Sequence, residues 1–272
     1  VGRITKSGLE QPVGAAAINR VPRKMIMEAV REVCEMCEYT EGIQVCISIP
    51  GGEEVAKKTF NPRLGIEGGL SVLGTSGIVV PMSEKALIAS IRLEMEMKRK
   101  NGAKYLLLTP GNYGADFVKE NTKLDVESSM KCSNYVGETL DMAVELGFLG
   151  VLFVAHIGKF VKVSGGIMNT HSRHSDARAE LMCAHALRSG ADLETAKAIL
   201  ETITTEEAME IIRMHGLQDA VMEQMAEKVH QYMQHRVEGA IQTEAILFSN
   251  RFGYLGETKG AEKLAEKFKY DL

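Results

Sequence analysis

The sequence predicts an α/β protein with a mainly parallel sheet flanked by helices and a helix-rich C-terminal part. Two short apolar runs, Tyr105–Leu108 and Leu149–Ala155, are each followed by a glycine-bearing loop and a helical pattern. Alternating strands and helices favour parallel strands with helices on both faces. From Ala177 onward, nearly every pattern is helical, which predicts the helix-rich end.

Residues 1–100 are expected to form the remainder of an N-terminal α/β domain, and residues 101–272 a second domain. Apolar residues at helical spacing predict a helix over Pro22–Glu38. Alternation over Ile43–Ile49 predicts a strand, closed by a Pro-Gly-Gly turn. The chain begins at Val1 inside a polar segment, so we expect that an N-terminal portion of the protein is absent from it.

The segment 103–117 holds the first strand–loop–helix unit. Pro110 cannot donate a hydrogen bond to a strand, and Gly111 and Gly114 permit positive φ angles. Free loop amides and a helix N-terminus would face a crevice at the carboxyl end of the strand. The pattern fits a ligand loop and a tight turn without a ligand equally well. The residues of the expected loop are Thr109, Pro110, Gly111, Asn112, Tyr113 and Gly114.

The second unit repeats this pattern about fifty residues later, where the run Leu149–Ala155 meets the segment His156–Lys159. A helix is expected before it at Asn134–Leu146. Phe248–Gly256 is expected to be a loop. The helices predicted beyond the second unit cover residues 177–188, 193–202, 205–215, 217–236 and 259–270.

Composition excludes several classes of protein. The formal net charge of −4 argues against a nucleic-acid binder, which needs a clustered basic excess. No apolar run approaches the roughly 20 residues of a membrane span. Five cysteines at irregular spacing do not form a disulfide framework, so a reducing cytoplasm is expected.

The segment 169–176 is dense in hydrogen-bonding side chains. His171 and His174 are three residues apart, with Asp176 next and His156 as a further candidate, so a metal-dependent hydrolase is one hypothesis. A substrate-binding loop fits better, because only two of the ligands that zinc needs are close in sequence. Basic residues beside loop glycines, in an acidic protein, indicate an anionic small ligand.

Several segments in order along the chain resemble one known family. They are 8–23, 59–66, 68–79, Thr109–Asn112, His156–Lys159 and Asn169–Ser172. The sequence Gly68-Gly-Leu-Ser-Val-Leu-Gly-Thr-Ser-Gly77 is part of this match. On these residues the chain resembles the cobalt-precorrin-5B C1-methyltransferase family of anaerobic cobalamin biosynthesis. It departs from the family in lacking the N-terminal portion with its Thr-Thr-Gly start and in having Ala155 where glycine is usual.

The resemblance implies a methyltransferase that uses S-adenosylmethionine to methylate C1 of cobalt-precorrin-5B, giving cobalt-precorrin-6A. It implies a cobalt-containing tetrapyrrole as partner. From the position of the first strand–loop–helix unit we expect the loop 109–114 to bind the cofactor, and we expect no nucleic acid, membrane or metal site. A homo-oligomer is left open, and so is a non-catalytic tetrapyrrole-binding fragment. Polar or acid–base roles are expected for His156 and His171. Substrate contacts are expected from Arg63, Thr75, Ser76, Gly77, Lys159, Asn169, Ser172 and Arg173.

Overall fold

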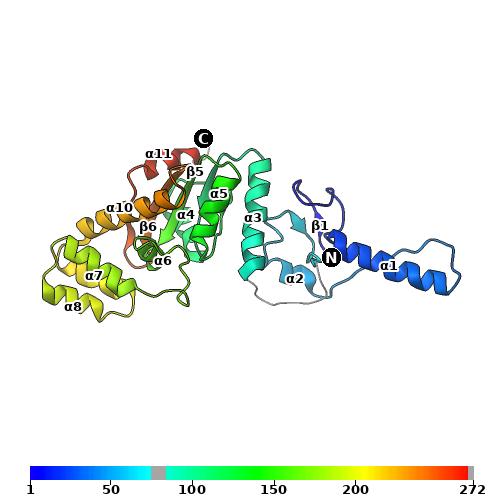
Figure 1. The fold of residues 1–272 in the computed structure, drawn as a ribbon, viewed down its shortest axis with the longest axis horizontal. Coiled ribbons are helices and arrows are strands. Elements are labelled where there is room, and N and C mark those ends of the chain that lie inside the picture. Colours follow the sequence, from blue (N-terminus) through cyan, green and yellow to red (C-terminus); the bar gives the residue numbers. More distant parts are fainter. Residues whose placement is uncertain (75–83, 269–272) are drawn as a thin grey trace. The chain divides into compact units, whose positions relative to one another are not determined.

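The computed structural model describes residues 1–74 and 84–268 of the 272-residue chain. Within it the chain divides into two compact units, Val1–Asn101 and Gly102–Leu272, and each is described by itself (Figure 1). In the described ranges no helix has the length and apolar character needed to cross a membrane.

The first unit has a small apolar core. A two-stranded antiparallel pair, β1 with β2, packs with Ala17, Leu64 and Met97. Helix α1 buries none of its residues and projects from the rest of this unit (Figure 1). The elements of this unit are β1 (Arg3–Ile4), α1 (Arg20–Met36), α2 (Gly52–Ala56), β2 (Ile66–Glu67) and α3 (Glu84–Lys100).

The predicted helix at Pro22–Glu38 is confirmed as α1, but the predicted strand at Ile43–Ile49 is wrong. That segment belongs to no helix or strand, and Ile43, Val45 and Ile47 are all exposed. Alternation makes a strand only where a neighbouring strand supplies hydrogen bonds. In the described part of the chain no strand pairs with this segment, so its alternating residues do not form a strand.

The second unit is built on a five-stranded sheet in the order β4-β3-β5-β6-β7. The first four strands are parallel, and β7 pairs antiparallel with β6. The predicted strands at 105–108 and 149–155 are therefore confirmed as parallel neighbours, β3 and β5. The elements of this unit are β3 (Tyr105–Leu108), α4 (Asn112–Asn121), η1 (Val126–Ser128), β4 (Ser129–Met130), α5 (Val136–Glu145), β5 (Gly150–His156), α6 (Ile157–Val163), α7 (Arg178–Arg188), α8 (Leu193–Leu200), α9 (Thr205–Met214), α10 (Gln218–Arg236), β6 (Gln242–Ser249), β7 (Gly253–Glu257), α11 (Ala261–Ala265) and η2 (Glu266–Phe268).

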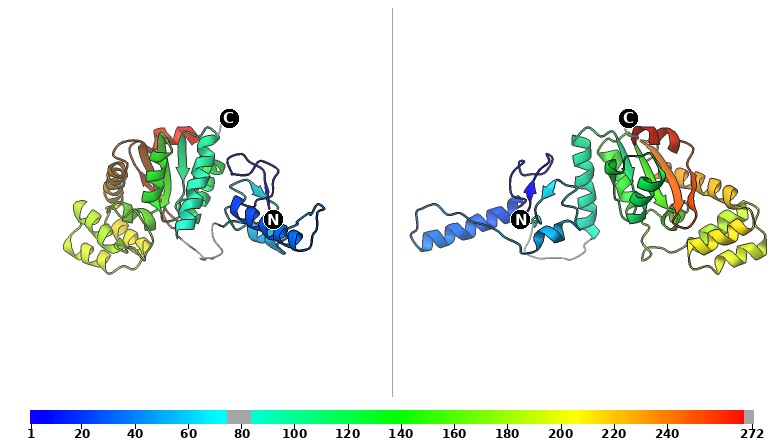
Figure 2. Two further views of the ribbon diagram at one scale, coloured as in Figure 1. Left: turned by 45° about the vertical axis from the view of Figure 1, so that its right-hand side comes forward. Right: turned by 180° about the vertical axis from the view of Figure 1, so that it is seen from behind.

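Helices cover both faces of this sheet. Leu107, Leu152 and Val154 point to one face, where they pack with α4, α11 and η2. The other face is contacted by α5, α6 and α10. Helices α7 and α8 lie at the end of the unit opposite α11 in every view (Figures 1 and 2). The expected α/β class with a helix-rich C-terminal part is thereby confirmed.

The predicted loop at Phe248–Gly256 is wrong. Strand β6 ends at Ser249, and after a tight turn β7 begins at Gly253. Two glycines and a polar turn suggested a loop, whereas the segment is the antiparallel edge of the sheet. The predicted helix over 259–270 begins at Ala261 and becomes a 3-10 turn at Glu266.

The connections place four loops at one edge of the sheet. The chain leaves β3 toward β4 on one side, whereas it leaves β5 toward β6 on the other. In open α/β sheets, ligands commonly bind at such a change of direction, outside the carboxyl ends of the two central strands. The loops after β3, β4, β5 and β6 all end at this edge because the four strands are parallel.

Candidate functional site at the carboxyl edge of the sheet

The loop after β3 has a backbone that only glycine adopts readily. Gly111 has φ 134° and ψ −176° and precedes the first residue of α4. Gly114 lies one turn into α4, where an added Cβ would come within 2.8 Å of the Val154 carbonyl oxygen. The two glycines therefore have different tasks: the first shapes the loop, and the second lets α4 pack closely on β5.

The same loop contains a polar group without a partner. The Thr109 side chain is fully buried, and its hydroxyl makes no hydrogen bond in the described part of the chain. Gly111, the residue before α4, has no side chain that could cap this helix. A buried hydroxyl and a helix N-terminus with free amides are the groups that an anionic or polar ligand would use.

The loop after β5 is held by His156. Its Nδ1 accepts a hydrogen bond from the Gly158 amide at 3.0 Å and so caps α6. Its Nε2 lies 3.2 Å from Oε1 of Glu206, at the start of α9. The Tyr113 ring of the neighbouring loop lies 6.1 Å from the imidazole. Burial lowers the pKa of His156, with a smaller contribution from Lys159, although Glu206 acts in the opposite direction.

Glu206 also reaches the end of β6. The Ser249 hydroxyl donates to Glu206 Oε1 at 2.9 Å and accepts from the amides of Arg251 and Phe252. The second carboxylate oxygen, Oε2, is buried without a partner among the described residues. One carboxylate thus joins the ends of β5 and β6 to the helical layer that α9 belongs to.

Lys159 connects three of the loops. Its Nζ donates to Asn134 Oδ1 at 2.6 Å and lies 3.4 Å from the Ser133 carbonyl oxygen, both after β4. A Cβ on Gly111 would lie 3.8 Å from the same nitrogen. Burial lowers the pKa of this amine, and in the described chain no carboxylate lies within ion-pair distance of it. The nearby Cys132 thiol is buried, which raises its pKa to about 12.

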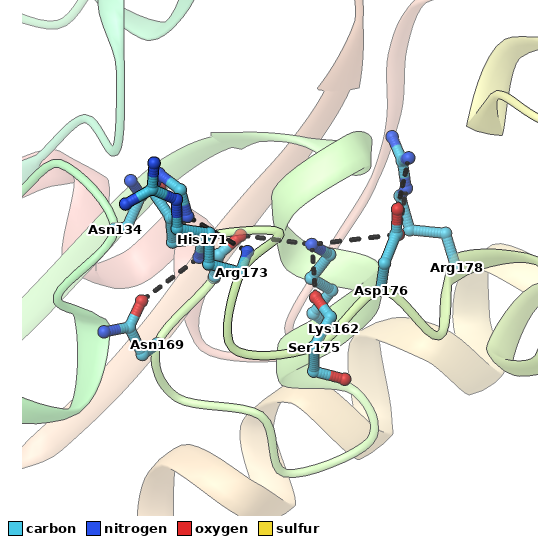
Figure 3. A network of polar contacts seen from close by, with 9 residues as sticks. Asn134, Lys162, Asn169, His171, Arg173, Ser175, Asp176 and Arg178 are labelled. Carbon is cyan, nitrogen blue, oxygen red and sulfur yellow. Dashed lines mark hydrogen bonds and ion pairs between the residues drawn. The ribbon is translucent and has the colours of Figure 1, made fainter.

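A second lysine, Lys162, holds the polar segment 169–176 through the segment's backbone carbonyl oxygens (Figure 3). Lys162 is buried, and its Nζ donates to the carbonyl oxygens of Thr170 and Ser175 at 3.2 and 2.8 Å. Thr170 also bonds Asn134, through its amide to the carbonyl oxygen and through its hydroxyl to Oδ1. The segment is therefore joined through Asn134 to Lys159.

Within this segment, His171, Ser172 and Arg173 are exposed and Asn169 is half-buried, and local bonds hold the chain. The His171 amide donates to Asn169 Oδ1, and the Arg173 amide donates to His171 Nδ1. Arg178, rather than Arg173, pairs with Asp176, through two bonds of 2.6 and 2.8 Å. In the ranges 1–74 and 84–268 the Arg173 guanidinium has no hydrogen bond or ion pair, so it is available to a ligand.

The histidines do not form a metal centre with other residues of the segment. The rings of His171 and His174 have their centroids 6.5 Å apart, and both residues are exposed. Among the described residues, no group of three or more His, Cys, Asp or Glu side chains has a geometry suited to a metal ion. The hydrolase hypothesis thus finds no support in the arrangement of these side chains.

Comparisons with known proteins address the class of reaction. The sequence model of the CbiD family matches residues 1–81, and that described as "CbiD, C-terminal domain" matches residues 169–259. The chain is 49% identical over 250 residues to the cobalt-precorrin-5B C(1)-methyltransferase of Ruminiclostridium cellulolyticum, covering 92% of this chain and 65% of the relative. Proteins with the same name from Alkaliphilus metalliredigens and Photorhabdus laumondii are 43% and 44% identical over 269 residues, covering 99% and 98% of this chain and 70% of each relative. The chain belongs to the CbiD family.

Membership of the CbiD family confirms the expected class of enzyme. Its members are S-adenosylmethionine-dependent C1-methyltransferases of cobalamin biosynthesis. The chain spans about two thirds of the length of the curated relatives that it matches. No solved structure matches the chain. The CbiD matches thus identify the class, and the roles of individual residues rest on the geometry above.

The expected substrate contacts in the first unit of this CbiD chain stay predictions. Arg63 lies 3.8 Å from the carboxylate of Glu94, whose pKa is raised by burial. Thr75, Ser76 and Gly77 lie outside the described residues. Within the first unit, Arg63 is thus paired with an acid of α3.

Three residues at the edge were missed from the sequence: Asn134, Glu206 and Ser249. Asn134 carried a weak signal, since it ends a short polar stretch directly before an apolar helix. Glu206 and Ser249 carried none, because one lies among several acids at a helix start and the other in a segment expected to be a loop.

Proposed function

We propose that this chain methylates C1 of cobalt-precorrin-5B with S-adenosylmethionine as donor, giving cobalt-precorrin-6A. We further propose that the cofactor and the tetrapyrrole meet at the carboxyl edge of the second unit's sheet. Family membership supports the reaction. The observation that carries the site is the glycine-only backbone at Gly111 beside the Lys159 amine, which has no carboxylate partner in the described chain.

The residues of the first loop suit the polar end of S-adenosylmethionine. The free amides at the start of α4 can donate to its carboxylate, and the helix dipole favours negative charge there. The Thr109 hydroxyl offers a further donor or acceptor. The proposed cofactor loop is thus Thr109, Pro110 and Gly111 together with Asn112, Tyr113 and Gly114, which form the first turn of α4.

The segment 169–173 and Lys159 suit the tetrapyrrole, whose rim carries acetate and propionate groups. The Arg173 guanidinium can bind a carboxylate through two parallel bonds, which a lysine cannot reproduce. Lys159 adds a second positive charge at the same edge. Asn169, His171 and Ser172 offer neutral partners, so this edge presents cations and hydrogen-bonding groups.

Methyl transfer requires of the protein mainly that it orient the donor and the acceptor carbon. S-adenosylmethionine, when bound, supplies an electrophilic methyl group on a positive sulfur. The protein's part is to hold C1 in line with that group and to exclude water, which would otherwise stabilise the charged donor. No strong base is obligatory for this step, in agreement with an edge made of a shaped loop, cations and hydrogen-bond donors.

A glycine substitution tests the cofactor loop. Gly111→Val places a β-branched residue where φ is 134°, so the loop must change shape. We expect affinity for S-adenosylhomocysteine, measured by calorimetry, to fall at least tenfold, about 1.4 kcal/mol. Gly147→Val is the matched control, because Gly147 also has positive φ (71°) and open space but precedes β5, at the opposite edge.

Equal loss of affinity in both variants, or in neither while both stay folded, would contradict this placement of the cofactor. Loss in Gly111→Val alone would support it. Methyl transfer to the tetrapyrrole, followed by the mass of the product, tests the reaction itself and is measured on the same preparations.

A further inference from the structure

We propose that Glu206 is a positioning residue for the methyl transfer, one that holds the proton of the neutral His156 ring on Nε2 and thereby fixes the loop after β5. This inference rests on the proposed function for its kinetic part. It concerns a residue of α9, in the helical layer, about fifty positions from the loop that it holds.

The hydrogen bonds of His156 determine where its proton lies. Nδ1 accepts the Gly158 N–H at 3.0 Å, so this nitrogen must carry a lone pair. Nε2 faces Glu206 Oε1 at 3.2 Å and, farther away, the Asn250 amide at 3.4 Å. The Gly158 amide makes the shorter of the two amide contacts, and a carboxylate oxygen can only accept, so we place the proton of the neutral ring on Nε2. A protonated ring would place an N–H against the Gly158 N–H and break the cap of α6. Both nitrogens are therefore engaged, and neither is free to accept a proton from a substrate.

The groups around His156 agree with this assignment. Burial lowers the pKa of His156 against the opposing effect of Glu206, and Lys159, one turn along α6, lowers it slightly further. Tyr113 on α4 and Phe248 on β6 contribute rings, at 6.1 and 5.5 Å between centroids. Arg251, after β6, is occupied by Glu210 through bonds of 2.6 and 2.9 Å. Of the described groups, Glu206 is thus the one carboxylate bonded to the imidazole.

Glu206 is itself well placed to act as a fixed acceptor. The N-terminus of α9 carries a complete capping box between Thr204 and Glu207, which fixes the first turn. Thr205 in the same turn is buried, and its hydroxyl would lie 3.4 Å from a Cβ on Gly158. The bond from Ser249 orients Oε1 further. The first turns of α6 and α9 therefore meet, with His156 and Glu206 between them.

Two substitutions separate positioning from a purely electrostatic role. Glu206→Ala removes the acceptor, whereas Glu206→Gln keeps an oxygen for the His156 Nε2–H and the Ser249 hydroxyl. We expect kcat to fall about tenfold in Glu206→Ala, with KM changed little, and to recover to within about threefold of the parent in Glu206→Gln. If the negative charge itself stabilised the cationic donor, the glutamine variant would be as impaired as the alanine variant.

The tautomer is read independently of activity by nitrogen-15 NMR of histidine-labelled protein. The His156 signals are assigned by their absence in His156→Asn, and we expect an unprotonated Nδ1 in the parent protein and a mixture of tautomers in Glu206→Ala. Glu210→Gln is the control, because it breaks the Arg251 pair on the same helix without contacting His156.

Each outcome has one meaning. An unchanged tautomer in a folded Glu206→Ala protein, or equal kcat values for the alanine and glutamine variants, would overturn the proposal. A shifted tautomer with rescue by glutamine supports it. Absence of methyl transfer in the parent protein would instead count against the proposed function, and the NMR readout of the His156–Glu206 pair would still stand.

Discussion

The two strand–loop–helix units at the centre of the sheet have the same topology, but the polar groups of their loops differ in whether they have hydrogen-bond partners. The loop after β3 leaves the Thr109 hydroxyl without a partner among the described residues, and its last residue, Gly111, has no side chain to bond the first amides of α4. The loop after β5 has its cap filled by His156 and its lysine bonded to Asn134. Of two loops at equivalent positions in one sheet, one thus has a buried hydroxyl without a partner among the described residues, and the other has its polar side chains hydrogen-bonded within the protein.

This difference assigns different tasks to the two loops. Buried polar groups in folded proteins are nearly always paired, so unpaired groups at a crevice indicate a ligand. The loop after β5 holds its neighbours in place, and it contributes to the proposed tetrapyrrole site through the positive charge of Lys159. The predictions below test this division, beginning with the largest expected effect.

Gly114→Val should destabilise the second unit by about 2–3 kcal/mol, because a Cβ there would come within 2.8 Å of a β5 carbonyl oxygen and the backbone must move. The midpoint of urea denaturation measures this. Ala115→Val, one residue further along α4, is the control and should cost only a few tenths of a kcal/mol of helix propensity. A Gly114→Val protein as stable as its control would show that α4 does not depend on this close approach, and that the loop after β3 is less rigidly seated than we argue.

The sequence predicted the central strands because their apolar runs are uninterrupted and bounded by breakers, as a buried parallel strand requires. It missed β6 for a physical reason. This strand carries Glu244 in its middle, buried and bonded by the Thr258 hydroxyl and the Gly260 amide. A buried acid held by partners in the turn after β7 breaks the apolar pattern while leaving the strand intact.

The Arg173 side chain, with no partner in the described chain, provides the second test. Arg173→Ala should raise the KM for the tetrapyrrole about fivefold, near 1 kcal/mol for one exposed ion pair, and leave S-adenosylhomocysteine affinity unchanged. Arg178→Ala is the matched control, since Arg178 is occupied by Asp176. Loss of cofactor affinity in Arg173→Ala would mean that the segment 169–173 and the β3 loop do not have separate ligands.

As with the fold, the parts of the candidate site that could be predicted are those marked by local sequence patterns. Lys159 and His156 were found because both are adjacent in sequence to a strand end. The roles of Glu206 and Asn134 depend on contacts across 50 and 25 residues of chain. Local patterns carry no information about such contacts, so the groups that bond these two side chains become visible only in the folded chain.

The smallest expected effect is a pH dependence that belongs to the loop after β5. The pKa of His156 is lowered in the folded protein, first by burial, so the unfolded chain binds a proton that the folded chain resists. Stability is therefore unaffected well above the ordinary histidine pKa of about 6.5 and should decline as the pH falls below it. His156→Asn removes the titration while asparagine, a good N-cap residue, can still accept the Gly158 N–H. We expect the parent protein to lose more free energy of unfolding than His156→Asn between pH 7.5 and 5.5, as measured by urea denaturation. The pKa of buried His185 is also lowered, but this residue is present in both proteins and cancels in the difference. Equal losses would mean that His156 accepts a proton without breaking its cap, and the contrast between the two loops would then lose its basis in the His156 tautomer.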